Sequence, residues 1–102
     1  MRANQGIIRV EGRPDAGSWR CTVVVGDDPG ATTHQVTVTT DELRRFAPPG
    51  VAIERLVHAS FGYLLEREPR ESILREFDLS VISRYFPGYE REIRRRLEGA
   101  DD

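Results

Sequence analysis

The residues that could carry chemistry gather near the end of the chain, where arginines and tyrosines share a short stretch. Arginine offers positive charge and planar hydrogen-bond donors, and tyrosine offers a ring that can stack on bases or fill pockets in proteins. This stretch predicts a binding surface for a protein partner or, as an alternative, for nucleic acid. The candidate binding residues are Arg84, Tyr85, Tyr89, Arg91, Arg94 and Arg95.

The charge pattern of the same stretch favours the protein partner over nucleic acid. Glu90 precedes Arg94 by four residues and Glu92 precedes Arg96 by four, which is the spacing of ion pairs on a helix surface. Much of the positive charge is therefore expected to be neutralised locally. The whole chain has a net charge of -2 and an isoelectric point near 5.7, far below the range typical of nucleic-acid-binding domains.

Lysine is absent from the chain, so all fifteen basic residues are arginines. A Walker-type phosphate loop requires a lysine, and Schiff-base or pyridoxal chemistry requires an amine nucleophile. Neither class of function is compatible with this chain acting alone. The same bias means that basic surfaces must be judged by how the arginines cluster rather than by their number.

Metal and nucleophile chemistry have few candidate residues. The chain has two histidines, His34 and His58, and one cysteine, Cys21, whereas a zinc site needs three or four protein ligands. Cys21 alternates with Trp19 and Val23 on a predicted buried strand face, where a thiol normally packs as a small apolar group. We therefore predict no metal, no cofactor and no catalytic residue. An enzyme whose site the sequence does not reveal is kept as an alternative.

The first forty residues have the patterns of β-strands. Residues 6–12 are short, β-branched and bounded by glycines, and residues 18–26 and 32–39 alternate apolar and polar side chains. We predict a three-stranded antiparallel β-meander with one apolar face. Matching the apolar positions of the second and third strands places Val23 opposite Val36.

The rest of the chain has the apolar spacing of helices, interrupted by prolines and capping residues. Phe77 is predicted to be a core residue, and Asp78 is predicted to cap the helix that follows it. Gly62 lies inside a long helix, which predicts close packing against a neighbouring element. The predicted helices are residues 40–47, 51–67, 69–77, 79–85 and 87–98.

Together these elements predict an α+β protein of one domain over residues 1–102, with several short helices packed on one face of the sheet. No apolar run approaches the roughly 20 residues that span a membrane, and no signal-peptide core follows Met1. A cytoplasmic protein without a membrane partner is expected.

Residues 64–90 read LLEREPRESILREFDLSVISRYFPGYE, a stretch that resembles a group of small bacterial proteins of unassigned function. The resemblance covers about a quarter of the chain, with the pattern LLEREPxESILxxFDLSVISRYFPxYE. It implies a bacterial setting and nothing about mechanism. The function predicted from the residues is a non-catalytic protein–protein interaction module or a homo-oligomer, such as a homodimer.

Overall fold

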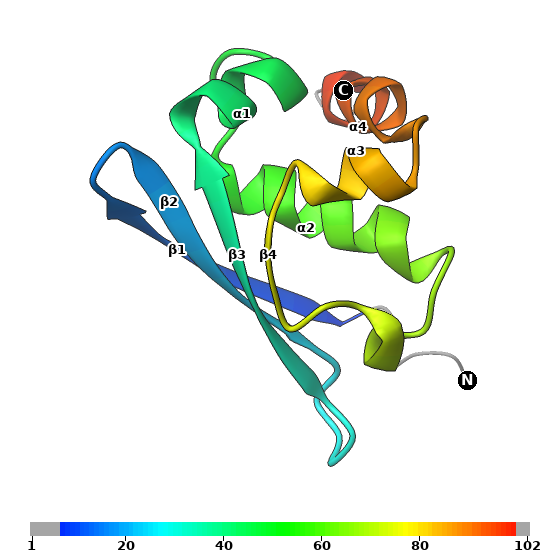
Figure 1. Ribbon diagram of the computed structural model, residues 1–102. Coiled ribbons are helices and arrows are strands. Elements are labelled where there is room, and N and C mark those ends of the chain that lie inside the picture. The colour runs from blue at the N-terminus through cyan, green and yellow to red at the C-terminus, as the bar shows by residue number, and fades with distance from the viewer. Residues whose placement is uncertain (1–6, 100–102) are drawn as a thin grey trace.

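The structure, a computed structural model, describes residues 7–99 of the chain. It has an α+β fold in which a four-stranded sheet carries helices on one face (Figure 1). No helix within residues 7–99 is long and apolar enough to cross a lipid bilayer. The elements in chain order are β1 (Ile8–Asp15), β2 (Ser18–Val25), β3 (Thr32–Thr39), α1 (Thr40–Phe46), α2 (Ile53–Leu65), the 3-10 helix η2 (Arg70–Ser72), β4 (Glu76–Asp78), α3 (Val81–Tyr85) and α4 (Tyr89–Gly99).

β4 is an element that the sequence pattern does not predict, and it makes the sheet mixed and four-stranded rather than antiparallel and three-stranded. β1, β2 and β3 form the predicted meander, while β4 runs parallel to β3. The predicted helix over residues 69–77 is wrong, because only η2 is helical there. Ile73 and Phe77 have helical spacing, but the free edge of β3 offers backbone hydrogen bonds, such as Gln35 N–H to the Arg75 carbonyl (2.8 Å). Tertiary pairing therefore overrides the local pattern.

The first hairpin is longer and tighter than predicted. β1 continues past residue 12, where the predicted strand ends, and stops at Asp15, which pairs with Ser18. Ala16 and Gly17 form the connection, with φ values of 48° and 85°, as a two-residue hairpin turn requires. Pro14 is tolerated inside β1 because this strand lies at the edge of the sheet, where one side needs no hydrogen-bond donor.

The second hairpin differs from the predicted register by two residues. Val23 pairs with His34 rather than with Val36, so each apolar side chain keeps its predicted face. The connecting loop, residues 26–31, bends around the guanidinium of Arg70. That group makes two hydrogen bonds of 2.9 Å to the carboxylate of Asp28, and these hold the pKa of Asp28 down at about 2.

The other helices follow the predicted ranges closely. α1 begins with a capping box: the hydroxyl of Thr39 accepts the Glu42 N–H (3.0 Å), and the Glu42 carboxylate accepts the Thr39 N–H (2.9 Å). Asp78, predicted as the cap of α3, lies in β4 instead. The predicted close packing at Gly62 is also wrong. A methyl group at that position would have as its nearest neighbour the guanidinium of Arg96, 4.0 Å away.

The core forms where the apolar face of the sheet meets α2, and α4 packs against α2. The ring of Phe61 packs at its centre, with ring centroids 5.3 Å from His34 and 6.1 Å from Phe77. Phe77 is buried as predicted. A second aromatic contact joins Tyr89 of α4 to Phe46 of α1, with centroids 5.3 Å apart. These contacts fix α2 against β3 and β4, and α4 against α1.

Candidate functional site

Two of the predicted binding residues, Tyr85 and Tyr89, lie in opposite environments. Tyr85 is 68% exposed, whereas Tyr89 is completely buried. The hydroxyl of Tyr89 is 2.7 Å from that of Ser60, which in turn donates to the carbonyl of Leu56 (2.8 Å). Burial raises the pKa of Tyr89 well above its ordinary value. Tyr89 is a core residue, so we leave it out of the candidate surface.

The arginines at the end of α4 are largely occupied by ion pairs. Arg95 holds both carboxylate oxygens of Glu92, at 3.1 and 2.7 Å. Arg96 bridges Glu92 and Glu66, at 2.7 Å from each, so the predicted pair between Glu92 and Arg96 is confirmed. Arg95 and Arg96 hold the pKa of Glu92 down at about 2. This cluster of charge is neutralised within the fold.

Of the remaining predicted arginines, Arg84 lies on α3, and Arg91 and Arg94 lie on α4. Arg94 donates to the carbonyl of Arg45 (2.7 Å), and Glu90, its predicted partner, pairs with the Arg45 guanidinium at 3.0 Å. Within residues 7–99, the side chains of Arg84 and Arg91 make no hydrogen bond or ion pair, and both residues are exposed. They belong to different helices. The charge left for a nucleic-acid backbone is therefore small.

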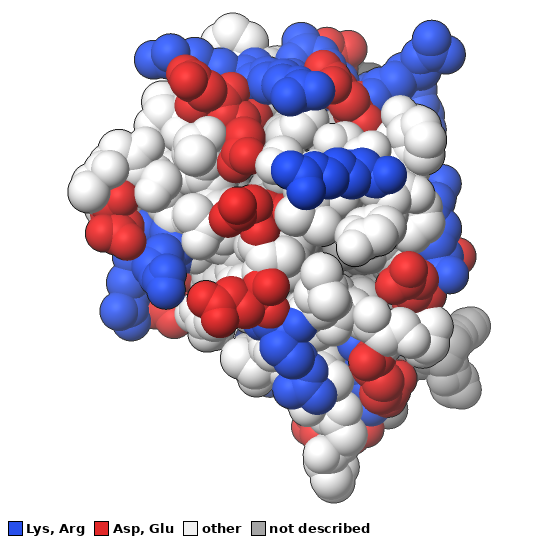
Figure 2. Space-filling view, in the orientation of Figure 1, with Lys and Arg blue, Asp and Glu red and all other residues white. Residues whose placement is uncertain are grey.

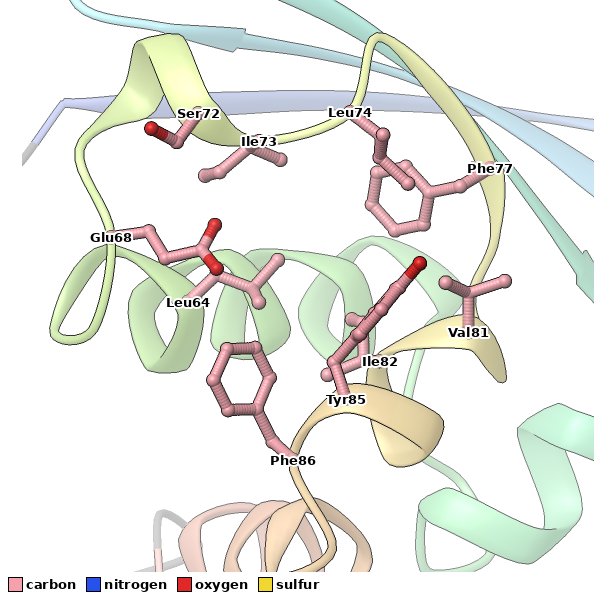
Figure 3. Close-up of a pocket in the computed structure, with 10 residues that line it drawn as sticks. All are labelled: Leu64, Glu68, Ser72, Ile73, Leu74, Phe77, Val81, Ile82, Tyr85 and Phe86. Carbon is pink, nitrogen blue, oxygen red and sulfur yellow. The ribbon is translucent and has the colours of Figure 1, made fainter.

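An apolar groove lies between the end of α2, the segment from η2 to β4, and α3 (Figure 3). Its cavity has a volume of about 170 Å³. Leu74 and Tyr85 are the large apolar side chains exposed among the described residues, at 49% and 68%, and both line this groove. We call it the Tyr85 groove. Its lining residues are Leu64, Glu68, Ser72, Ile73, Leu74, Phe77, Val81, Ile82, Tyr85 and Phe86.

The fold positions Tyr85 through a short helix that is fixed at both ends. At its start, the Leu79 N–H donates to the Thr37 carbonyl of β3 (3.0 Å), and at its end the Phe86 N–H donates to the Ile82 carbonyl (2.9 Å). Ile82 is buried and points to the core, while Tyr85 follows three residues later at the surface. Figure 3 shows Tyr85 reaching from α3 toward Leu74 and Phe77 along one side of the groove.

His34 fixes the opposite wall of the groove to the sheet. Its Nδ1 is 2.8 Å from the carbonyl of Leu74, and its Nε2 is 2.8 Å from the hydroxyl of Thr32. The neutral ring satisfies both contacts when Nδ1–H donates to the carbonyl and Nε2 accepts from the hydroxyl. Burial lowers the pKa of His34 below its ordinary value of 6.5. The neutral form of His34 therefore holds the Leu74 backbone in place.

This arrangement predicts that the protein loses stability as the pH falls below about 6.5. Because the native pKa of His34 is lowered, the unfolded chain binds a proton in a range where the folded chain does not. The stabilisation is thus complete above pH 6.5 and is lost as the pH falls through the native pKa. Urea unfolding at pH 7.5 and 5.5 measures the loss of stability, and an NMR titration of the His34 ring measures its native pKa.

Asp28 and Glu92, with pKa values of about 2, provide a comparison with His34. Their contributions to the free energy of unfolding are lost only in much more acidic solution. A His34 titration midpoint at or above 6.5 would contradict the predicted direction.

The thiol and metal candidates are not among the residues that line the groove. Cys21 is buried in β2, and burial, reinforced by the nearby carboxylate of Glu54, raises the pKa of its thiol to about 11. His34 uses both ring nitrogens in the contacts above, and His58 is exposed on α2. Within residues 7–99, no three His, Cys, Asp or Glu side chains lie close enough together to hold a metal ion.

A second hollow, of about 310 Å³, lies on the polar face of the sheet near the β1–β2 turn. Arg13 and Arg20 are cross-strand neighbours there, and Asp15 adds a negative charge. In contrast, the Tyr85 groove has a mainly apolar lining, and Figure 2 shows uncharged surface beside the basic side chain that lies across α3. The Tyr85 groove is therefore the stronger candidate for a protein interface.

Sequence reasoning identified Tyr85 but missed the rest of the groove. Leu74 lies in the segment whose apolar spacing predicted the wrong helix over residues 69–77, and Glu68 lies just before it, so that pattern did not place either side chain at a binding surface. One local signal for Leu74 is that two large apolar residues, Ile73 and Leu74, are adjacent in the sequence. Because Ile73 is buried, its neighbour Leu74 faces solvent. Comparisons with known protein families, curated proteins and solved structures find no match to this chain. The resemblance of residues 64–90 to bacterial proteins stays a prediction.

Proposed function

We propose that this chain is a protein-binding module whose Tyr85 groove receives a large apolar side chain of its partner. One observation carries the proposal: the exposed large apolar side chains of residues 7–99, Leu74 and Tyr85, border the same cavity. Exposed apolar surface around a hollow is typical of protein interaction sites, and aromatic residues are enriched among those that dominate binding energy. The setting that we propose, from the resemblance of residues 64–90 and the lone cysteine, is a bacterial cytoplasm.

The size of the groove supports a side chain as its occupant rather than a cofactor. Pockets for drug-sized molecules usually enclose about 300–1,000 Å³. The Tyr85 groove encloses about 170 Å³, close to the roughly 150 Å³ of an apolar cavity that holds one benzene molecule. One aromatic or large aliphatic side chain matches this volume.

The same proposal predicts which substitutions remove binding. Peptides selected from a display library against the wild-type chain are expected to share one aromatic or large aliphatic residue. Leu74→Ala and Tyr85→Ala should each weaken binding of the selected peptides at least about tenfold, since truncated hot-spot residues commonly cost more than about 1.4 kcal/mol. Titration calorimetry measures the affinity, and thermal melts should show little change because both side chains are exposed.

Val24→Ala is the matched control, because Val24 is a partly exposed aliphatic residue on the opposite face of the sheet. It should leave peptide affinity unchanged. Selected peptides that bind the Leu74 and Tyr85 variants as tightly as the wild type would place the binding surface elsewhere.

A further inference from the structure

Tyr85 lies at the rim of the groove and is itself a side chain of the size that the groove could receive. Its ring is largely exposed, and the cavity beside it has about the volume that holds one aromatic ring. A projecting ring and a matching hollow on one surface make that surface self-complementary. Self-complementarity is what a two-fold symmetric interface requires, because the same patch meets itself across the axis.

Two opposite charges beside the groove, on Glu68 and Arg84, also make this surface complementary to a second copy of itself. Glu68 lines the groove and is partly buried, and Figure 3 shows its carboxylate directed into the hollow near Leu64. Arg84 directly precedes Tyr85 and is exposed. Neither side chain makes a hydrogen bond or an ion pair within the part of the chain that the structure describes. A partly buried carboxylate without a partner is unfavourable, and an arginine supplied from outside would compensate it.

We infer that the occupant of the Tyr85 groove is a second copy of this chain. In the resulting two-fold dimer, Tyr85 of each copy enters the groove of the other, and Arg84 pairs with Glu68 across the interface. The inference rests on the proposed function and names the partner. Each groove is completed by residues of the other copy, so the dimer forms two equivalent sites.

The limited exposed apolar area indicates a weak dimer. Leu74 and Tyr85 are the large apolar side chains that the described surface exposes, whereas stable interfaces bury about 1,200–2,000 Å² with a dense apolar centre. Dissociation is therefore expected in the micromolar range or above, and the association must be measured at high concentration.

Sedimentation equilibrium from about 5 µM to 1 mM tests the inference. The wild-type chain is expected to pass from monomer to dimer in this range. Tyr85→Ala should weaken dimerisation at least about tenfold. The control Val24→Ala should dimerise as the wild type does. Thermal melts establish that each variant is folded.

Charge reversal tests the pairing across the interface. Arg84→Glu and Glu68→Arg should each weaken the dimer about tenfold, because each places two like charges together. The double variant restores opposite charges in both sites and should recover affinity to within about threefold of the wild type. A double variant as weak as the single ones would overturn the pairing of Arg84 with Glu68.

Two further outcomes separate this inference from the proposed function. A wild-type chain that stays monomeric at 1 mM, while Tyr85→Ala still loses the selected peptides, would overturn the dimer and leave the protein-binding groove standing. A dimer that survives Tyr85→Ala and Arg84→Glu unchanged would overturn the inference by placing self-association on another surface.

Discussion

Replacing Tyr89 by alanine is expected to lower the free energy of unfolding by about 3–5 kcal/mol, whereas the same change at Tyr85 should alter it by less than about 0.5 kcal/mol. Tyr89 is completely buried, with its ring centroid 5.3 Å from Phe46 and 5.4 Å from Tyr63 in edge-to-face geometry. Truncation removes these contacts and leaves a cavity. Because a small domain is stable by only about 5–15 kcal/mol, this loss would lower its melting temperature strongly.

Urea unfolding followed by circular dichroism measures both variants under the same conditions. Tyr89→Phe separates the hydroxyl from the ring and should cost only about 1 kcal/mol, because Ser60 keeps its hydrogen bond to the Leu56 carbonyl. Equal effects of alanine at positions 85 and 89 would show that the ring of Tyr89 does not contribute to the core.

Replacing Phe77 by alanine is the second change with a large expected effect, a loss of about 3–5 kcal/mol of stability. The ring is 9% exposed and lies against Phe61, and it is the one large apolar side chain of β4. Its loss should therefore also loosen the pairing of β4 with β3. Since Phe77 lines the Tyr85 groove, peptide binding should weaken together with stability.

Glu76→Ala provides the control for this change, because Glu76 is an exposed neighbour in the same strand and should alter stability by less than about 0.5 kcal/mol. Denaturant unfolding, together with hydrogen exchange of the β4 amides, measures the two effects. A Phe77→Ala variant with wild-type stability would mean that β4 is not anchored by its central side chain.

Much of the fold could be predicted because its signals are local. The alternation in residues 18–25 and 32–39 gave the correct buried face, and the capping box at Thr39 and Glu42 gave the start of α1. The exact pairing could not be predicted, since a slip of two residues keeps every side chain on its face. β4 could not be predicted either, because the three-residue strand exists only where β3 offers it an edge.

The candidate site depended even more on non-local structure. Tyr85 and Tyr89 are four residues apart, a spacing that would place them on one face of a single helix. However, α3 ends at Tyr85 and α4 begins at Tyr89, so the two side chains do not share a face. The Glu92 and Arg96 pair follows from spacing within one helix. The contact of Glu90 with Arg45 joins two helices and has no sequence signal.

The position of β4 in the chain also bears on the order of folding. The contact between His34 and the Leu74 carbonyl joins residues 40 positions apart, whereas β1 and β2 meet through a two-residue turn. Because closing a long loop costs more entropy, the hairpin is expected to form first and β4 to join later. The walls of the groove would then form the part of the molecule that opens most readily, and an occupant would slow amide exchange there before it slowed exchange in the hairpin.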